Sequence, residues 1–316
     1  MYKMQSEGGT PQDVQIPVAI LGCGLIGISW AALFLHHGID VHAWDPNPDA
    51  RNWLAERVKP SMAQLLQMDP PARALGHLSV FSEMPEALEG VSFVQENAPE
   101  VVAVKHEIYQ IFERYAASDA LIASSASGLS WSALSAGMQA PDRLLTAHPF
   151  NPPHLVPLVE MFCPSTAALD RADAMYRQIG RVPVRMKREA TGHIANRLAS
   201  ALWREAVNIV AEGIADVEAV DLALVNGPGL RWAVTGAHMT YHLGGGDGGM
   251  AHYLEHLGPS QESRWADLGS PTLTPEVCAA LIAGVEAAAK GKSLQQLEQI
   301  RDVGLMSLLA ARSDTT

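Results

Sequence analysis

The stretch Val18-Ala19-Ile20-Leu21-Gly22-Cys23-Gly24-Leu25-Ile26-Gly27, followed by ISWAALFLHHG at 28–38, decides the fold. Four apolar residues after Pro17 are typical of a buried parallel strand, and residues 24–37 have the apolar spacing of a helix that stops at Gly38. Glycines between such elements let the backbone approach a pyrophosphate at the positive end of the helix. We therefore predict that a dinucleotide is bound by Gly22, Gly24, Leu25, Ile26 and Gly27. A glycine-rich turn without a ligand is the alternative, which the strand–turn–helix context disfavours.

The choice of dinucleotide depends on Asp45. Residues 40–44 predict a second strand, and Asp45 follows it, eighteen residues beyond Gly27. A carboxylate at this position accepts hydrogen bonds from the adenosine ribose and repels a 2′-phosphate, so NAD is favoured over NADP. Arg51 lies nearby in the sequence and is the one residue that weakens this preference.

Alternation of short apolar runs and helical segments continues along the first part of the chain. Helices are expected, for example, at 101–115 and 167–179, and further strands at 78–81, 91–95, 121–124, 144–148, 158–161 and 182–186. Such alternation predicts an α/β fold with a Rossmann-type, doubly wound parallel sheet. After about residue 190 the segments are helical, which predicts an all-α C-terminal domain. We expect a flexible tail at 1–16, an NAD-binding domain at 17–190 and a helical substrate and dimerisation domain at 191–316.

Composition excludes several classes of partner. The chain has 316 residues and a formal net charge of −12, which argues against nucleic acid and anionic membranes as partners. Three widely spaced cysteines indicate neither a disulfide framework nor a zinc ribbon, so we expect a reducing, cytoplasmic location. No apolar run approaches the length of a membrane span. The HxxEH pattern at 252–256 is attributed to chance, and no metal is expected.

Several chemically capable side chains follow the predicted strands. His148 ends one strand and Glu160 ends the next, and the turn between them would let the carboxylate fix the tautomer of the imidazole. A structural histidine is the alternative for His148 taken alone. Ser127 follows the strand LIASS and offers a hydroxyl to a substrate oxygen, while Asn196 opens a long helix.

At these residues the chain resembles the L-3-hydroxyacyl-CoA dehydrogenase superfamily, over almost its whole length. The matching motifs are SASGL at 125–129, HPFNP at 148–152, LVE at 158–160 and GHIANR at 192–197, the last in place of the usual GFxxNR. The resemblance implies a catalytic quartet of Ser127, His148, Glu160 and Asn196. It also implies that Asn151 lies beside the nicotinamide and that Glu100 and Lys105 contact its ribose. His148 would then take the proton of a secondary alcohol while the carbon passes a hydride to NAD.

The segment GPGLRW at 227–232 departs from the acyl-CoA enzymes. Arg231 presents a planar fork suited to a free carboxylate, although a surface arginine in a salt bridge is the alternative. The segment resembles a subgroup that uses free 3-hydroxy acids, which includes L-gulonate 3-dehydrogenase (the lambda-crystallin type) and L-carnitine dehydrogenase, and is more similar to the latter. A trimethylammonium group favours aromatic faces, for which Phe150, Trp232 and Tyr241 are candidates.

The sequence permits alternatives for the substrate and for the function, and it predicts an oligomeric state. Val234 and His238 stand where aromatic residues are expected in carnitine enzymes, so the substrate is L-carnitine or another small 3-hydroxy acid. A true 3-hydroxyacyl-CoA dehydrogenase and a non-catalytic, crystallin-like NAD-binding protein are the competing functions. Residues 192–310 carry more apolar side chains than their few helices can cover, which predicts a homodimer through this domain.

Overall fold

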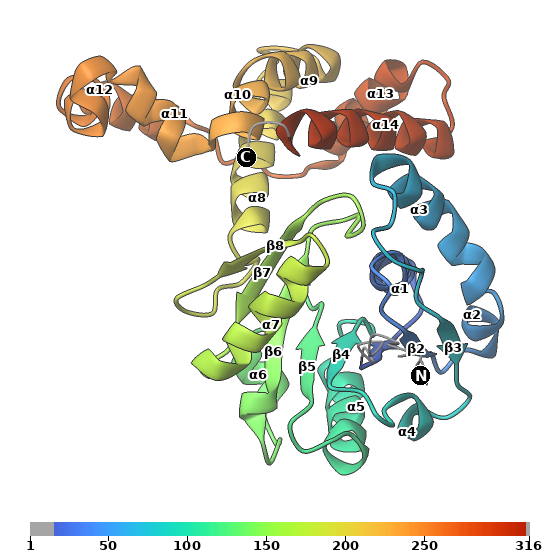
Figure 1. Cartoon of the computed structure of the whole chain (residues 1–316). Coiled ribbons are helices and arrows are strands. Elements are labelled where there is room, and N and C mark those ends of the chain that lie inside the picture. Colours follow the sequence, from blue (N-terminus) through green and yellow to red (C-terminus); the bar gives the residue numbers. More distant parts are fainter. Residues whose placement is uncertain (1–15, 314–316) are drawn as a thin grey trace, which may run out of the picture. The chain divides into compact units, whose positions relative to one another are not determined.

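The computed structural model describes residues 16–313, which divide into two compact units at Ile194 and Ala195 (Figure 1). The tail expected at residues 1–16 lies, apart from Ile16, outside the described residues. The first unit contains an eight-stranded sheet with helices on both faces, and the second is helical. The predicted fold class, a Rossmann-type sheet followed by an all-α region, is confirmed.

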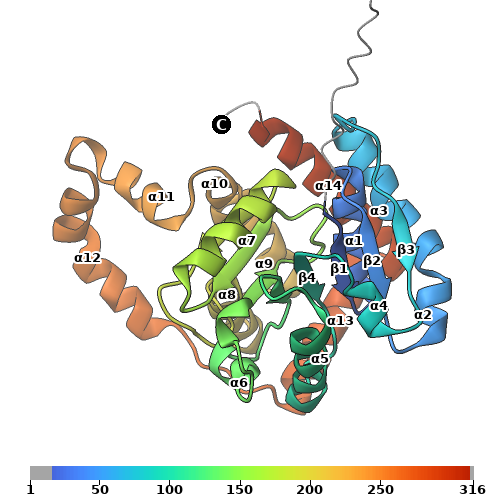
Figure 2. The same ribbon diagram turned by 60° about the horizontal axis from the view of Figure 1, so that its bottom comes forward.

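The strands of the sheet are arranged in the order β3-β2-β1-β4-β5-β6-β7-β8, and Figure 2 shows β3, β2, β1 and β4 side by side. Their bounds are β1 Val18–Leu21, β2 Val41–Trp44, β3 Leu78–Val80, β4 Phe93–Glu96, β5 Leu121–Ser124, β6 Leu144–Pro149, β7 Leu158–Phe162 and β8 Val182–Arg185. The six strands β1–β6 are mutually parallel, and the order reverses direction beside β1. Ligands of open α/β sheets bind at such a switch point, at the carboxyl ends of the strands.

The last two strands depart from the parallel arrangement. β7 pairs with β6 in antiparallel register, and β8 is parallel to β7. Residues 150–157, which join β6 to β7, are fewer than the dozen or more that a parallel crossover needs. The chain therefore turns back, and Glu160 pairs directly with His148 in the register.

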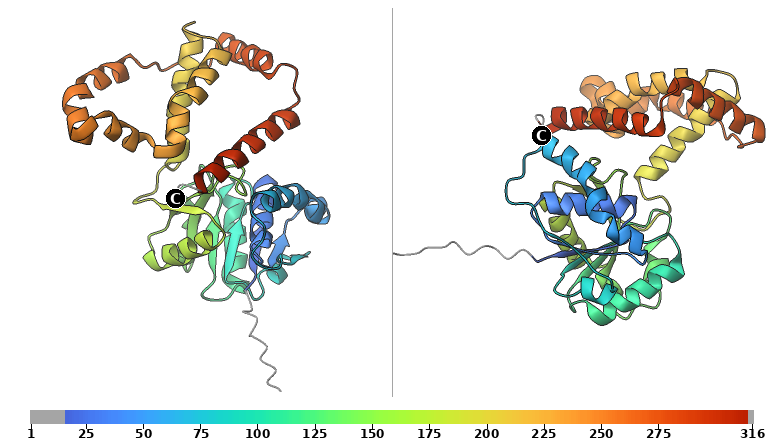
Figure 3. Two further views of the ribbon diagram at one scale, coloured as in Figure 1. Left: turned by 45° about the horizontal axis from the view of Figure 1, so that its top comes forward. Right: turned by 90° about the vertical axis from the view of Figure 1, so that its right-hand side faces the viewer.

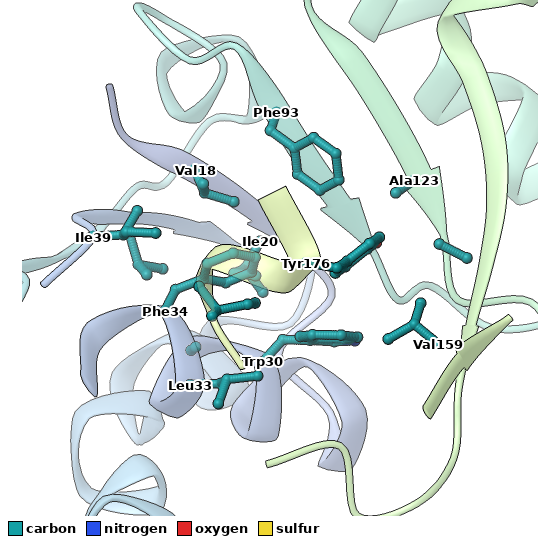
Figure 4. Close-up of a cluster of buried hydrophobic side chains, with 14 of the residues drawn as sticks. Val18, Ile20, Trp30, Leu33, Phe34, Ile39, Phe93, Ala123, Val159 and Tyr176 are labelled. Carbon is teal, nitrogen blue, oxygen red and sulfur yellow. The ribbon is translucent and has the colours of Figure 1, made fainter. Parts of the chain in front are cut away.

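Helices cover both faces of the sheet, in two layers that can be followed in Figure 3. One face is packed by α1, α3 and α7 and the other by α4, α5 and α6. The bounds of the helices in this unit are α1 Leu25–His36, α2 Pro48–Asn52, α3 Leu54–Met68, α4 Met84–Ala87, α5 Val102–Tyr115, α6 Trp131–Ser135, the 3-10 turn η1 Pro141–Arg143 and α7 Thr166–Gln178. In Figure 4, Trp30 of α1 packs against Tyr176 of α7, with 5.5 Å between ring centroids. This aromatic contact joins the two helices over the middle of the sheet.

The second unit consists of helices joined by short turns. They are α8 Ala195–Ala211, α9 Val217–Asn226, α10 Pro228–Thr235, α11 Ala237–Gly244, the 3-10 turn η2 Gly246–Gly248, α12 Gly249–Asp267, α13 Pro275–Ala289 and α14 Leu294–Ser313. The two large hydrophobic clusters of the described chain are made wholly by residues of the first unit. Within residues 16–313, no helix is both long and apolar enough to cross a membrane.

Candidate active site

The glycine loop between β1 and α1 meets two separate steric demands. A Cβ atom on Gly27 would lie 1.9 Å from the carbonyl oxygen of Gly22, so only glycine lets the helix start this close to the turn. A Cβ atom on Gly24 would meet nothing within 4 Å. The space beside Gly24 is therefore open, as the close approach of a pyrophosphate requires.

The start of α1 suits an anion. Gly24 occupies the N-cap position of this twelve-residue helix and makes no side-chain cap, so the N–H groups of the first turn point toward the open space beside the loop. Burial and the Asp45 charge raise the pKa of the Cys23 thiol to about 12, which keeps this loop residue neutral. These features fit the diphosphate of a dinucleotide.

Asp45 is held in place by backbone amides. Its Oδ2 accepts a hydrogen bond from the Cys23 N–H at 2.7 Å, and its Oδ1 accepts one from the Asn47 N–H at 2.8 Å. Arg51 donates from Nη1 to the backbone carbonyl of Asp45 at 2.5 Å. The carboxylate is thus oriented beside the glycine loop, where ribose hydroxyls can donate to its remaining lone pairs.

His148 and Glu160 form a buried dyad. Nδ1 of His148 lies 3.1 Å from Oε2 of Glu160, and the two residues are 6 % and 1 % exposed. The second carboxylate oxygen, Oε1, accepts the Ile194 N–H at 2.7 Å. The carboxylate therefore accepts a hydrogen bond from Nδ1–H of His148. This leaves the lone pair of Nε2 to take a proton from a substrate.

Ser127 lies in the loop after β5 and is tied to Glu100. The Glu100 carboxylate accepts hydrogen bonds from the backbone N–H groups of Ser127 and Gly128, the latter at 3.0 Å. Glu100, which the resemblance places at the nicotinamide ribose, thus also shapes the loop that carries Ser127. Glu100 and Ser127, which were predicted to have separate roles, are therefore in direct contact.

Lys105 is buried in the interior, although the resemblance implies that it contacts the nicotinamide ribose. It is fully buried, and its Nζ donates to Oε1 of Glu96 at 2.6 Å and to the Ala98 carbonyl at 3.1 Å. Tyr109 and Ser124 donate to the other oxygen of Glu96. In this structure Lys105 neutralises a buried carboxylate at the end of β4, and its contact with the ribose stays a prediction. Glu96 was not singled out by sequence, since a glutamate inside a strand carries no local signal of an ion pair nine residues away.

The turn after β6 carries Phe150 and Asn151. His154 anchors it, because its Nδ1 and N–H both lie within 2.8 Å of the Ser29 hydroxyl on α1, and its Nε2 contacts Oε1 of Gln64 on α3 at 2.6 Å. Asn151 is exposed and Phe150 half-buried. Both positions therefore lie on a tethered turn directly after His148.

Three predicted site residues belong to the second unit. Asn196 lies in the first turn of α8, and Arg231 and Trp232 lie on α10. Arg231 is exposed and Trp232 half-buried. No ion pair of Arg231 is present among residues 16–313.

Sequence reasoning missed His193. Its ring stacks on that of His148, with 4.7 Å between centroids and 16° between planes, and the residue is 3 % exposed. The available signal was the motif GHIANR, in which histidine stands at the position of the usual phenylalanine. Glu160 lies in the middle of β7 and does not end its strand as expected, but it still pairs with His148. A glycine fingerprint, an oriented ribose acceptor and this buried His–Glu pair across β6 and β7 together define a dinucleotide-dependent dehydrogenase of the Rossmann type.

Comparison with known proteins gives the family. The model of the 3-hydroxyacyl-CoA dehydrogenase NAD binding domain matches residues 17–190, and that of the C-terminal domain of the same family matches residues 192–278. The chain belongs to the 3-hydroxyacyl-CoA dehydrogenase family and is an NAD-dependent dehydrogenase that acts on a hydroxyl group.

Three similar proteins illustrate its place in that family. The L-carnitine dehydrogenase of Nocardiopsis dassonvillei is 42 % identical over 96 % of this chain and 93 % of its own. That of a Pseudomonas species is 38 % identical over 93 % of this chain and 92 % of its own. The crystal structure of 5-formyl-3-hydroxy-2-methylpyridine 4-carboxylic acid 5-dehydrogenase matches with a TM-score of 0.80 at 24 % identity, covering 93 % of this chain and 97 % of that one, which supports the fold alone.

Proposed function

We propose that the protein oxidises the 3-hydroxyl group of L-carnitine, or of a closely related small L-3-hydroxy acid, to the 3-oxo acid with NAD as acceptor. The observation that carries the reaction type is the buried pair of His148 and Glu160 at the carboxyl end of β6. The substrate class is supported by relatives named L-carnitine dehydrogenase, which are 37–42 % identical over nearly the whole chain.

In the proposed mechanism the base is His148. Bound NAD supplies the acceptor for the hydride that leaves C3 of the alcohol. Nε2 of His148 takes the hydroxyl proton, and Glu160 stabilises the imidazolium across the 3.1 Å contact with Nδ1. Ser127 and Asn196 hold the oxygen as it becomes a carbonyl. The remaining roles are those expected from the resemblance, with Glu100, Lys105 and Asn151 at the nicotinamide and Asp45 at the adenosine ribose.

Arg231 is the proposed partner of the substrate carboxylate. Its guanidinium is exposed and has no ion pair among the described residues, so its donors are available to an anion. A CoA thioester carries no carboxylate at this position and would leave the arginine unpaired on binding. Phe150 and Trp232 are the proposed aromatic contacts of the trimethylammonium group. Tyr241 is a weaker candidate, because its ring packs against that of Tyr253 at 5.2 Å.

A substrate panel tests this proposal. NAD reduction is followed by absorbance with L-carnitine, D-carnitine, L-gulonate, L-3-hydroxybutyrate and 3-hydroxybutyryl-CoA. The proposal expects the highest kcat/KM for L-carnitine and none for its D enantiomer. Preference for L-gulonate or for the CoA thioester would replace the substrate, and absence of turnover with all five would favour a non-catalytic NAD-binding role.

We further infer that the protein is a cytoplasmic homodimer. Twenty or so large apolar side chains of the second unit are exposed, including Leu198, Ile214 and Val234 at 64–75 %, while few are buried. Such a surplus supports an isologous contact through the helices. The three cysteines are free thiols, which supports a reducing compartment. Sedimentation at micromolar concentration tests the dimer, and a monomer would refute it.

A further inference from the structure

His193 lies beside two parts of the first unit that the proposed mechanism uses, His148 and the Ser127 loop. Its ring lies flat on the ring of His148, at 4.7 Å and 16°. A hydrogen bond with the Ser127 backbone is among the influences on the pKa of His193, so the ring also lies beside the loop that carries Ser127. Because Nδ1 of His193 has no partner among the described residues, we assign this contact to Nε2–H, with the Ser127 carbonyl as the acceptor.

The backbone at His193 is shaped to hold these contacts. The residue has a left-handed φ of +51°, which histidine tolerates better than most residues, and its N–H bonds to the Ala190 carbonyl in a turn. The next residue, Ile194, donates its N–H to Glu160. Residues 193 and 194 therefore contact the base, its carboxylate and the Ser127 loop at once.

The Ser127 backbone is consequently held from two sides. Its N–H donates to the Glu100 carboxylate, and its carbonyl accepts from His193. Because both peptide groups that flank Ser127 are fixed, the direction in which its hydroxyl leaves the backbone is set. A ring without a donor at position 193 would keep the packing on His148 and lose this second restraint.

Burial and the neighbouring charges favour the neutral form of His193. The groups that face it are His148 on β6, Glu160 on β7, Glu100 after β4 and the Ser127 carbonyl. Burial and then the charge of His148 lower the pKa of His193, against smaller opposing effects of the carboxylates and the hydrogen bond. A proton on Nδ1 would also be a buried donor without an acceptor. The imidazolium that forms on His148 therefore faces a neutral ring.

We propose that His193 is a positioning residue of the active site: as a neutral imidazole it supports the face of His148 and anchors the loop of Ser127. The proposal rests on the proposed function, because it assigns His193 to the same proton transfer. It concerns a position at which the family motif usually has phenylalanine, so the hydrogen bond to Ser127 belongs to the histidine of this chain.

Two substitutions separate the ring from the donor. His193→Phe keeps the aromatic ring and removes Nε2–H, and His193→Gln keeps an N–H at similar reach and removes the ring. We expect His193→Phe to lower kcat with L-carnitine about fivefold or more, the value of one lost hydrogen bond, with NAD affinity unchanged. His193→Gln keeps a donor but loses the ring that lies on His148, so it is expected to recover only part of that loss. Wild-type kcat in His193→Phe would overturn the proposal.

A matched control lies elsewhere in the same unit. His106 on α5 also contacts a backbone carbonyl, that of Ala133, through Nε2 at 2.9 Å. His106→Phe therefore makes the same chemical change away from the dyad, and kcat should not change. Equal losses of kcat in the two phenylalanine variants would mean that His193 has a general structural role, which also overturns the proposal.

A second measurement needs no substrate. In protein labelled with [13C]histidine, the ring resonance of His193 is followed against pH in wild type and in His148→Gln. We expect His193 to take up its proton at a higher pH in His148→Gln, because the charged neighbour is gone. An identical titration in the two proteins overturns the pairing. If wild type oxidises no hydroxy acid, the proposed function fails and this titration alone decides the inference on His193.

Discussion

Replacing Glu160 by glutamine removes one acceptor from a site where both carboxylate oxygens are used. Oε1 accepts the Ile194 N–H at 2.7 Å and Oε2 lies 3.1 Å from Nδ1 of His148. A glutamine has a single carbonyl oxygen, and the backbone N–H of Ile194 cannot become an acceptor. The amide NH2 therefore faces His148, whose Nδ1 must then accept.

This change of partner puts the imidazole in the wrong tautomer. With Nδ1 as an acceptor, Nε2 carries the proton and has no lone pair for the substrate hydroxyl. The imidazolium also loses the carboxylate charge that stabilises it. We expect Glu160→Gln to lower kcat by about a hundredfold to ten thousandfold, the range that a positioned and oriented base contributes. The free energy of unfolding should fall by only about 1–2 kcal/mol, because size and one hydrogen bond are preserved.

The assay measures NADH formation with saturating L-carnitine, with NAD affinity from fluorescence titration and thermal melting as the folding check. Glu113→Gln is the matched control, since Oε1 of Glu113 accepts the Ala140 N–H at 2.7 Å away from the site. The control should keep wild-type kcat. A kcat within about threefold of wild type in Glu160→Gln would refute the reasoning, since general-base catalysis supplies far more than that.

Three further predictions concern the cofactor, the substrate and pH. Gly24→Ala should weaken NAD binding without loss of stability, because the added methyl enters open space. Gly27→Ala should instead lower the melting temperature, because its Cβ would lie 1.9 Å from the Gly22 oxygen. Equal melting temperatures in the two variants would contradict this prediction. Arg231→Met should raise the KM for the free acid about thirtyfold or more and leave NAD affinity unchanged, because a charge-assisted contact with the substrate is lost. An unchanged KM would mean that Arg231 does not bind the substrate. Burial lowers the pKa of His36, His37 and His193 below 6.5 in the folded state. The contribution of these neutral histidines to the free energy of unfolding should therefore be complete above pH 6.5 and be lost as the pH falls from 6.5 through their pKa values in the folded protein. Melting curves between pH 7.5 and 5 check the sign, and a smaller decline is expected in His193→Phe.

The elements of the first unit could be predicted closely because their signals are local. β1 and β5 have the predicted bounds, and α1 differs by a residue at each end. Four-residue apolar runs and a glycine stop are properties of neighbouring residues, so no distant contact is needed to recognise them. The residues of the dyad were also found from the sequence, since both lie at predicted strands.

The pairing of those residues was predicted from the turn between them, but the direction of their strands was harder to derive. The alternation predicts parallel strands throughout, yet β7 runs antiparallel to β6. The signal was present in the length of residues 150–157, which is too short for a parallel crossover. Asn196, Arg231 and Trp232 were identified by motif alone, and their roles stay predictions.

By itself, the sequence determined the strand–glycine–helix start, the succession of strands and helices and the two residues of the dyad. The sequence predicted that Glu160 meets His148, but only the tertiary structure decided the antiparallel register in which they pair. It alone also decided that Ile194 holds the second oxygen of Glu160, that Lys105 is buried against Glu96 and that His193 lies under the base. The physical reason is range. Periodicity and turn chemistry act over a few residues, whereas register, ion pairing in the interior and ring stacking join residues 9 to 45 positions apart, whose meeting depends on how the whole sheet packs.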